Sequence, residues 1–559
     1  MTTPTPRPRA ARPVAGWLPG YRKRLLRGDS LAALTAWALI VPECVAYAQI
    51  AGVPPQNAFY AAPVALLAYA LLGRSNFLIV GATSAAAVLS ASAVGDVSSD
   101  PGQAVGLSAA VAVIVGAVLL VAGFARLGFL TNFLAESALV GFLFGMALTI
   151  IVRQAAKLVG VSSGDGNFFE RTWAVLSKAP DWSMATLAVG ASALVLLFAL
   201  ERWLPRLPAS LVVLVLGLVV SAVLGLKDHG VEIVGKIPSA VPALHLPDIP
   251  AEDWLKLLGG ALGVALVVFA EAYSIGGRLA REHGQEIDAD REMKAVGVAN
   301  IAVGLVRGFV VSGSASRSAA ATAAGGRTPM TSLIAAGLVL VTGAFLTPLF
   351  TDLPEPVLGA IVIVAVRGFL RVGELRRYAA LDKPNLWVAL TALFGVLLFD
   401  LLPGLLLAVA LSLVLFIAAA SKPHVAVIGR LAGTDVYVDT ALHEQASTVS
   451  GVLAVRPDGG LFFGNAARVK LAVRDLVLAS QPQPSAVVLD ITATFHLGVP
   501  VLDALEELRE ELERDGITLH LAHIRAHADR SLQRHPLAAH LGPERVHRTV
   551  AEAVAAAMD

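Results

Sequence analysis

Three ionisable side chains lie inside long apolar stretches of the sequence: Arg317 in FVVSGSASRSAAA, Glu43 in ALIVPECVAYA and Glu271 in LVVFAEAYS. A full charge at membrane depth costs roughly 2.5–3.5 kcal/mol on insertion scales. Such residues are retained where they pair with one another or serve an ion or proton pathway. The three side chains are therefore candidates for binding or coupling chemistry.

Each of these residues has a functional and a structural interpretation. Arg317 either faces a bound anion or forms a structural ion pair with Glu43 or Glu271. The two interpretations are compatible if the ion pair opens when substrate enters. Glu271 has a coupling or gating role, or makes a packing hydrogen bond. Glu43 follows Pro42, which kinks a helix, and desolvation favours its protonated form, so it is a candidate proton carrier. Tyr47, one turn beyond, lines the same cavity or packs between helices.

The composition is that of an integral membrane protein. The chain has 559 residues, of which 56% are hydrophobic and 15% charged, with a mean hydropathy of +0.71. Soluble domains carry about 25% charged residues. The single cysteine, Cys44, excludes an intramolecular disulfide framework and a cysteine-based zinc site. The net charge of +1 and the lack of a basic cluster indicate no nucleic-acid partner.

The sequence contains no arrangement typical of an enzyme. It has no metal-ligand cluster, P-loop or nucleophile–His–acid set, so we expect no catalysis, no cofactor and no bound metal. The N-terminal MTTPTPRPRAARP lacks the apolar core of a signal peptide. It predicts a disordered cytoplasmic tail over residues 1–28.

Apolar runs follow one another from residue 29 to residue 422. A helix needs about 20 residues to cross the hydrocarbon core. Fourteen segments are predicted, near 31–50, 57–73, 77–93, 104–125, 131–152, 182–200, 209–226, 254–277, 293–307, 309–324, 330–350, 355–370, 385–400 and 402–420. Together they define a transmembrane domain at 29–422.

The loop charges orient these segments. Cytoplasmic loops are enriched in Lys and Arg, and alternate loops carry Arg74, Arg126, Arg202, Arg206, Arg278, Arg281, Arg327, Arg371, Arg376 and Arg377. Several loops between them carry neither: AGVPPQN, GDVSSDPGQA, TDLPEP and DLLPG. The alternation predicts an even number of passes through the cell inner membrane, with both termini in the cytoplasm.

The two halves of the transmembrane domain repeat one another. FLIVGATSAAA at 77–87 aligns with FVVSGSASRSAAA at 309–321, and Ala85 aligns with Arg317. A helix bearing Glu43 precedes the first motif, and one bearing Glu271 precedes the second. The repeats span about 29–226 and 254–422 with seven segments each, and an odd number inverts the second. Inverted repeats with paired, interrupted segments are typical of secondary transporters.

The repeated motif itself predicts an anion site. A short extended piece followed by Gly and small residues indicates a half-helix that starts near the membrane midplane. Its unpaired N–H groups and positive dipole end attract anions. Thr83, Ser84, Ser314 and Ser316 supply hydroxyl donors, and Arg317 adds a full positive charge.

A small soluble α/β domain follows over residues 423–559. GVLAVRP, LFFG, SAVVLDIT and ITLHLAHI have the composition of strands, and ARVKLAVRDLVLAS and VLDALEELREELERDG that of amphipathic helices. Strands that alternate with helices predict an α/β sheet.

These motifs resemble the SulP, or sulfate permease, family of anion transporters. The resemblance rests on DSLAALTAWALIVPECVAYAQIAGVPPQNAFYAA, ALLGRSNFLIVGATSA and AREHGQEIDADREMKAVGVANIAVGLVRGFVVSGSASRSAAATAAGGRTPM. The C-terminal GVLAVRPDGGLFFGNAARVK and VVLDIT resemble the STAS domain that usually follows. The match covers nearly the whole chain.

The resemblance implies an all-α polytopic fold of fourteen segments in a seven-plus-seven inverted repeat, with core and gate domains and a cytoplasmic STAS domain. It implies transport by an elevator-like alternating-access motion, and a homodimer in the membrane lipid. Carried over by motif, the substrate site comprises Glu43, Tyr47, Gly81, Ala82, Thr83, Glu271, Ser314, Ala315, Ser316 and Arg317.

Two departures from the family pattern matter. Many members have Gln where this chain has Glu43, and a carboxylate there favours proton-coupled uptake. The run HLGVPVLDALEE lacks the Asp-Ser/Thr pair of many STAS domains, which argues against a phosphorylation switch.

The sequence therefore predicts a secondary active transporter, with H⁺ symport of a small inorganic or organic anion through Glu43 and Glu271. A C4-dicarboxylate such as fumarate is favoured ahead of bicarbonate with Na⁺ and sulfate. A nucleobase symporter on the same fold and an anion channel are the alternatives.

Overall fold

The computed structural model describes residues 15–98, 100–129, 136–164, 166–204, 207–239, 241–399 and 401–559, with only the backbone of 401 and 402. Several predictions fall partly outside these ranges: residues 1–14 of the tail, 131–135 and 400 of two segments, and Arg206. The chain divides into two compact units between Ser412 and Leu413. The domain boundary at 422 and 423 stays a prediction.

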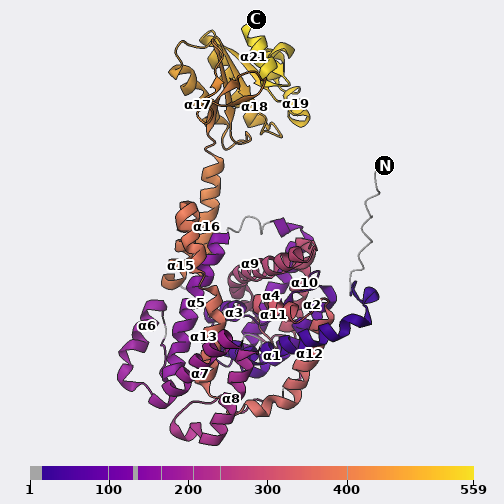
Figure 1. Cartoon of the computed structure of the whole chain (residues 1–559), viewed down its shortest axis with the longest axis vertical. Helices are drawn as coiled ribbons and strands as arrows, with labels where there is room; N and C mark the ends of the chain where they lie inside the picture. Colours follow the sequence, from indigo (N-terminus) through magenta and orange to yellow (C-terminus); the bar gives the residue numbers. More distant parts are fainter. Residues whose placement is uncertain are drawn as a thin grey trace. The chain divides into compact units, whose positions relative to one another are not determined.

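The helical unit confirms the predicted fold class, because each of the fourteen predicted segments contains a helix or most of one (Figure 1). The first half contains α1 (Leu26–Ile50), α2 (Pro55–Leu72), α3 (Ser84–Gly95), α4 (Ala104–Phe124), α5 (Glu136–Val159), α7 (Met184–Trp203) and α8 (Ala209–Leu224). The second half contains α9 (Ala251–Glu282), α10 (Ala289–Gly304), α11 (Ala315–Ala323), α12 (Met330–Val341), α13 (Glu355–Val366), α15 (Lys383–Phe399) and α16 (Leu401–Ala420).

Two short helices among the described residues of the helical unit were not predicted, α6 (Phe168–Ser177) and α14 (Val372–Leu381). Two short strands interrupt the helical unit, β1 (Ile79–Gly81) before α3 and β2 (Ser312–Ser314) before α11.

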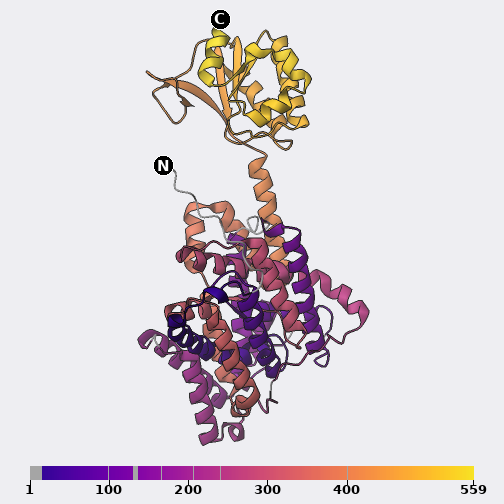
Figure 2. The ribbon, with the colours of Figure 1, turned by 90° about the vertical axis from the view of Figure 1, so that its right-hand side faces the viewer.

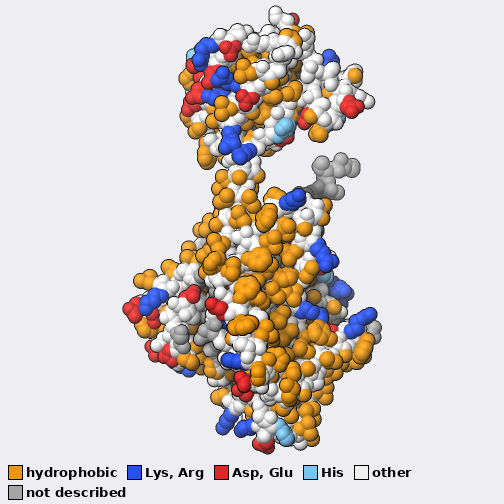
Figure 3. All heavy atoms as spheres, turned by 90° about the vertical axis from the view of Figure 1, so that its left-hand side faces the viewer, with side chains coloured by type: hydrophobic (Ala, Val, Ile, Leu, Met, Phe, Trp, Pro, Cys, Tyr) orange, Lys and Arg blue, Asp and Glu red, His pale blue; other side chains and the backbone are white. Residues whose placement is uncertain are grey.

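The surface of the helical unit suits a bilayer. Within the described chain, eight helices are long and apolar enough to cross a membrane, and α3, α8 and α15 are shorter apolar helices. Hydrophobic side chains cover much of the face drawn in Figure 3. Large apolar side chains of this unit, such as Val219, Val223 and Phe345, are exposed, which water would disfavour and lipid favours.

The helices form the core and gate domains. In the core domain, α4 packs on α9 and α10, α2 on α10 and α12, and α1 on α11 and α12. The α4–α10 contact is very close: a Cβ added at Gly116 would lie 2.5 Å from the carbonyl oxygen of Gly297. In the gate domain, α13 packs on α5 and α7, and α15 packs on α5. Small residues at such crossings let helix backbones approach, as is usual in membranes.

The second unit contains the predicted α/β sheet. Its strands are β3 (Val425–Leu431), β4 (Tyr437–Asp439), β5 (Ala446–Ser447), β6 (Val452–Pro457), β7 (Ala486–Asp490), β8 (Thr518–Ala522) and β9 (Val546–His547). The order is β4-β3-β6-β7-β8-β9, and β6 to β9 are parallel. One apolar core lies under α17 (Ala466–Ala479) and α18 (Val499–Arg514), and another under α21 (Val550–Met558). Figure 2 shows helices on either side of the strands.

One strand predicted in this unit, LFFG at 461–464, is wrong. The segment connects β6 to α17, and the backbone N–H of Phe462 donates to Asn465 Oδ1 over 2.9 Å. Leu461 is buried but Phe463 is 81% exposed, so the apolar composition does not reflect a buried strand.

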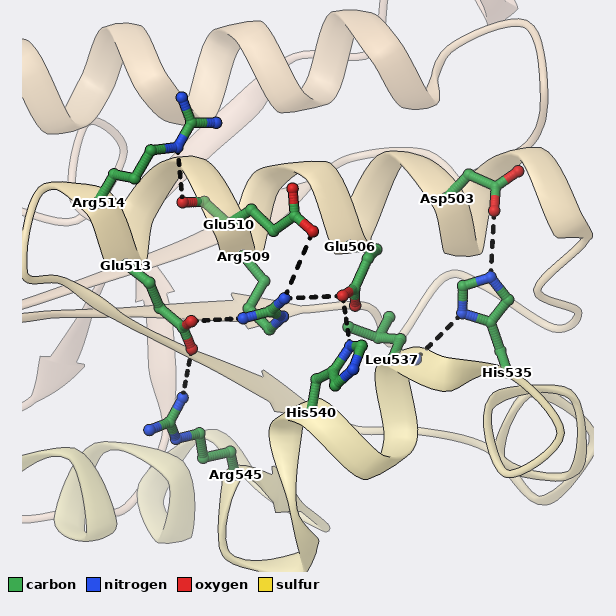
Figure 4. A network of polar contacts seen from close by, with 10 residues as sticks. All are labelled: Asp503, Glu506, Arg509, Glu510, Glu513, Arg514, His535, Leu537, His540 and Arg545. Atoms are coloured by element: carbon green, nitrogen blue, oxygen red, sulfur yellow. Dashed lines mark hydrogen bonds and ion pairs between the residues drawn. The ribbon is translucent and has the colours of Figure 1, made fainter.

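A charged network joins α18 to α20 (Pro536–Leu541) (Figure 4). Arg509 pairs with Glu506 and Glu513 on its own helix. Glu506 accepts from His540 on α20 over 2.5 Å. Although burial opposes it, the hydrogen bonds from Arg509 and His540 hold the pKa of Glu506 below its ordinary value. The network therefore fixes the short α20 on the surface of α18.

Candidate functional site

The two interrupted segments lie side by side. Strands β1 and β2 pair antiparallel, with Ile79 opposite Ser314 and Gly81 opposite Ser312. Equivalent strands related by a two-fold axis must run in opposite directions when they pair, so the pairing follows from the inverted repeat. Each strand leads into a half-helix, α3 or α11, whose N-terminus lies beside the other strand.

Buried polar side chains hold the strand pair in place. Asn300 on α10 accepts from the N–H of Val311 and donates to its carbonyl, both over 3.0 Å, as a neighbouring strand would. Ser312 donates to the carbonyl of Val268 on α9, and the N–H of Ile79 donates to Ser318 on α11 over 2.8 Å. Backbone groups in an apolar interior must be paired in this way.

Hydroxyl side chains cap both half-helices. Thr83 accepts from the N–H of Ala86 at the start of α3, and Ser314 accepts from the N–H of Arg317 at the start of α11. Ser314 also lies 3.3 Å from the hydroxyl of Ser316. The remaining N–H groups of each first turn and the positive dipole ends point toward the same region.

Arg317 lies behind the strand pair. Its side chain is almost fully buried, with 1% of its surface exposed. The Nε atom is 3.4 Å from Glu43 Oε2, Nη2 donates to the carbonyl of Ala82, and the guanidinium covers Gly81, where an added Cβ would meet Nη1 at 2.9 Å. A side chain at position 81 would therefore displace Arg317.

A cavity of about 550 Å³ opens in front of the half-helices. From the core domain it is lined by Tyr47, Thr83, Ser84, Glu271, Ser314, Ala315 and Ser316. From the gate domain it is lined by α5, including Glu136, and by Ala365, Gly368, Phe369 and Arg371 around the end of α13. The cavity therefore lies between the two domains.

The structure brings six of the ten predicted site residues to this cavity: Tyr47, Thr83, Glu271, Ser314, Ala315 and Ser316. Glu43, Gly81, Ala82 and Arg317 lie directly behind them and do not line it. Their part in substrate binding stays a prediction.

Several lining residues were not predicted as part of the site. Ser274, Arg278 and Arg281 follow Glu271 on α9 and line the same cavity, as does Arg371. From the sequence, Arg278 and Arg281 were interpreted only as cytoplasmic loop charges that orient the membrane segments. Their spacing from Glu271, at i+3, i+7 and i+10, places them on one helical face and was the signal that could have found them.

Comparisons with known proteins agree with this arrangement. The Sulfate permease family profile matches residues 26–392, and the STAS domain profile matches residues 444–553. The "Probable sulfate transporter Rv1739c" of Mycobacterium tuberculosis is 35% identical over 97% of this chain and 98% of its own length. The "Low affinity sulfate transporter 3" of Stylosanthes hamata is 30% identical over 98% of this chain and 90% of its own.

Solved structures share the fold. Murine Solute Carrier 26 family member A9, an anion transporter in the inward-facing state, matches with a TM-score of 0.89 at 22% identity, over 99% of this chain and 96% of that one. The transmembrane domain of the cyanobacterial bicarbonate transporter BicA matches with a TM-score of 0.60 at 21% identity, over 69% of this chain and 98% of that one.

The inverted-repeat fold, the paired half-helices and these matches define a multi-pass membrane transporter of anions, not an enzyme. The chain belongs to the sulfate permease family and carries its C-terminal STAS domain.

Proposed function

We propose that the chain is a proton-coupled symporter that carries a small oxyanion by elevator-like alternating access. The observation that supports it is the composition of the cavity in front of β1 and β2. Hydroxyl-capped half-helix N-termini lie there beside the carboxylate of Glu271, which forms no ion pair within the described residues, while Glu136 lines the cavity from the gate domain. The half-helix N-termini attract an anion bound in the cavity, whereas the ionised carboxylate of Glu271 repels it.

This opposition supplies the coupling. Two unit negative charges about 5 Å apart repel by about 3 kcal/mol at an effective dielectric constant of about 20. Protonation of Glu271 removes the repulsion, so the proton and the anion strengthen each other's binding. Thr83, whose hydroxyl lies 3.5 Å from Glu271 Oε2, joins the two sites.

We assign different roles to the two glutamates. Glu43 is the counter-ion of Arg317 behind the site, and Glu271 is the group that takes the proton from the cavity. Arg317 then acts through its bond to Ala82 and its field on the α3 and α11 N-termini, without direct contact to the substrate.

We infer that the cavity opens to the cytoplasm. Arg278, Arg281 and Arg371 line it, and Lys and Arg accumulate on the cytoplasmic side. Both termini and the STAS domain lie on that side in the cell inner membrane, and we retain the homodimer as part of the proposal. The opposite face, with the α1–α2 and α12–α13 connections, is called the outer face below.

The names of the relatives change the expected substrate. The sequence favoured a C4-dicarboxylate, but relatives of 30–35% identity are named sulfate transporters, so we place sulfate first and fumarate second. Uptake of labelled sulfate, fumarate and bicarbonate into proteoliposomes tests this under separate pH and Na⁺ gradients.

We expect an inward-directed proton gradient, with the external medium more acidic than the lumen, to drive sulfate uptake. A Na⁺ gradient should have no effect on this uptake. Uptake driven by Na⁺ alone would contradict proton coupling. Competition by uracil without competition by any anion would indicate a nucleobase symporter, and conductance that exceeds carrier turnover would indicate a channel.

A further inference from the structure

A second cavity of about 400 Å³ lies at the outer face. It is lined by Gln49 and Ile50 at the end of α1, by α5 from Thr149 to Lys157, and by Glu355 at the start of α13. Tyr47 lines the inner cavity and Gln49 the outer one, so the last turns of α1 form part of the wall between them. Opening the outer face requires this wall to move.

Three polar side chains meet across the outer cavity. Lys157 Nζ lies 3.1 Å from Glu355 Oε2 and donates to Gln49 Oε1 over 3.0 Å. Gln49 Nε2 donates to Glu355 Oε1 over 3.5 Å. The amide of Gln49 thus bonds the cation through its oxygen and the anion through its nitrogen.

The three residues belong to different moving parts. Lys157 and Glu355 both lie in the gate domain, where α5 packs on α13. The backbone around Glu355 is further fixed, because its N–H donates to the carbonyl of Glu232 over 2.9 Å and the N–H of Val234 donates to that of Leu353 over 2.9 Å. Gln49 lies on α1, the core helix that also carries Glu43 and Tyr47.

We propose that Gln49 is the positioning residue that holds the outer face shut, by fastening the core domain to the Lys157–Glu355 pair of the gate domain. The inference rests on the alternating access of the proposed function. When the core moves, the two Gln49 bonds break while the ion pair, which lies within one domain, persists. Lys157, freed from the amide, can then face an anion that enters the outer cavity, which Arg153 also lines.

The experiment measures how often the outer cavity opens. Thr149 lines this cavity and is 6% exposed, so a Thr149→Cys side chain reacts with a membrane-impermeant maleimide from outside only when the outer face opens. Two reconstituted full-length variants are labelled. The parent carries Thr149→Cys alone, and the second variant carries Thr149→Cys together with Gln49→Met. The chain without Thr149→Cys measures the reaction of the buried native Cys44.

We expect Gln49→Met to raise the labelling rate about fivefold. The substitution should remove about 1 kcal/mol of the free energy that stabilises the closed outer face, and that loss corresponds to an about fivefold larger open population. Gln154→Met is the matched control, because Gln154 lines the same cavity but lies on α5 within the gate domain. Its labelling rate should equal that of the parent.

Charge exchange gives a second, independent test. Lys157→Glu and Glu355→Lys each place two like charges beside Gln49 and should raise labelling. The double exchange restores an ion pair that the Gln49 amide can bond at both ends, so labelling should return to the parent rate.

An unchanged rate in Gln49→Met, or an equal rise in Gln154→Met, would overturn the proposal, as would a double exchange no better than the single variants. Labelling needs no substrate, so a wrong assignment of the anion or of the coupling ion leaves this result readable. Labelling of the parent that no substrate or pH gradient changes would count against alternating access itself.

Discussion

Arg317 and Glu43 form a buried ion pair that joins the second repeat to the first. The Nε and Oε2 atoms lie 3.4 Å apart, and neither has a hydrogen-bond partner within the described residues. The attraction is therefore mainly Coulombic.

Neutralising one member should cost more stability than neutralising both. Removing one partner of a buried pair leaves an uncompensated charge and costs about 3–5 kcal/mol, whereas replacing the whole pair is often nearly neutral. We expect Arg317→Gln and Glu43→Gln each to lower the thermal midpoint of the detergent-solubilised protein, and the double variant to recover part of the loss. Strict additivity of the two single effects would contradict the pairing.

Glu271→Gln should uncouple transport. The amide keeps the size and hydrogen bonding of a protonated carboxyl, so the anion still binds but carries no proton. We expect uptake driven by a pH gradient to fall at least tenfold and anion exchange at equal pH on both sides to remain. Glu43→Gln is the comparison: it should impair both modes, because it leaves Arg317 unpaired.

Thr83→Ala should weaken anion binding. It removes the α3 N-cap and one hydroxyl of the cavity, and a cap or a hydrogen bond is worth about 1 kcal/mol. The half-saturation concentration for sulfate uptake should rise about fivefold, which is the equivalent factor. Thr83→Ser keeps the hydroxyl and should stay near the wild type. Equal effects of the two substitutions would exclude a role for the hydroxyl.

Gly116→Ala should destabilise the core domain. The added methyl would lie 2.5 Å from the Gly297 carbonyl oxygen and 2.6 Å from Ile301 Cγ1, so α4 and α10 must separate. Overpacking of this kind costs about 1–3 kcal/mol. Gly337→Ala on α12 has open space around its added methyl and should keep or raise stability. Thermal unfolding in the same detergent compares the two.

The STAS unit should lose stability in mild acid. Burial, together with the neighbouring His547 and Arg545, lowers the pKa of His520 from 6.5 to about 4. Folding therefore favours the neutral ring, and the stability it contributes is full above pH 6.5 and is lost as the pH falls from 6.5 through 4. We expect a loss of about 1–2 kcal/mol between pH 7 and pH 5, after allowance for solvent screening.

Hydrogen exchange of the β8 amides in the full-length protein measures this loss. His520→Gln removes the titrating ring, so exchange in β8 should depend less steeply on pH than in the wild type. A pH dependence equal to that of the wild type would assign the effect to other groups, such as His547, whose pKa burial also lowers from its ordinary value.

Composition and periodicity predicted the fourteen membrane segments because long apolar helices have a strong sequence signal. The repeat predicted two strand-then-helix segments, and the structure contains both, with β1 and β2 paired. The short helices α6 and α14 were missed because both lie in loops between apolar runs.

The direction of Arg317 could not be predicted. Ser314, Ala315 and Ser316 line the cavity, while the next residue turns behind the strands to Glu43. One step along a helix rotates a side chain by about 100°, so the face that each residue presents depends on where the half-helix starts. That start is set by the Ser314 cap and the β2 register, which are tertiary features.

The β1–β2 ladder also constrains how the protein is made. Its strands come from opposite halves of the chain, with Ile79 and Ser314 235 residues apart. At about 5–20 residues per second, the ribosome needs about 10–50 s to synthesise the intervening chain. During that time β1 has no partner strand, and its backbone groups must find water or another protein at the insertion site. Biogenesis of the first repeat is therefore incomplete until the second has been inserted.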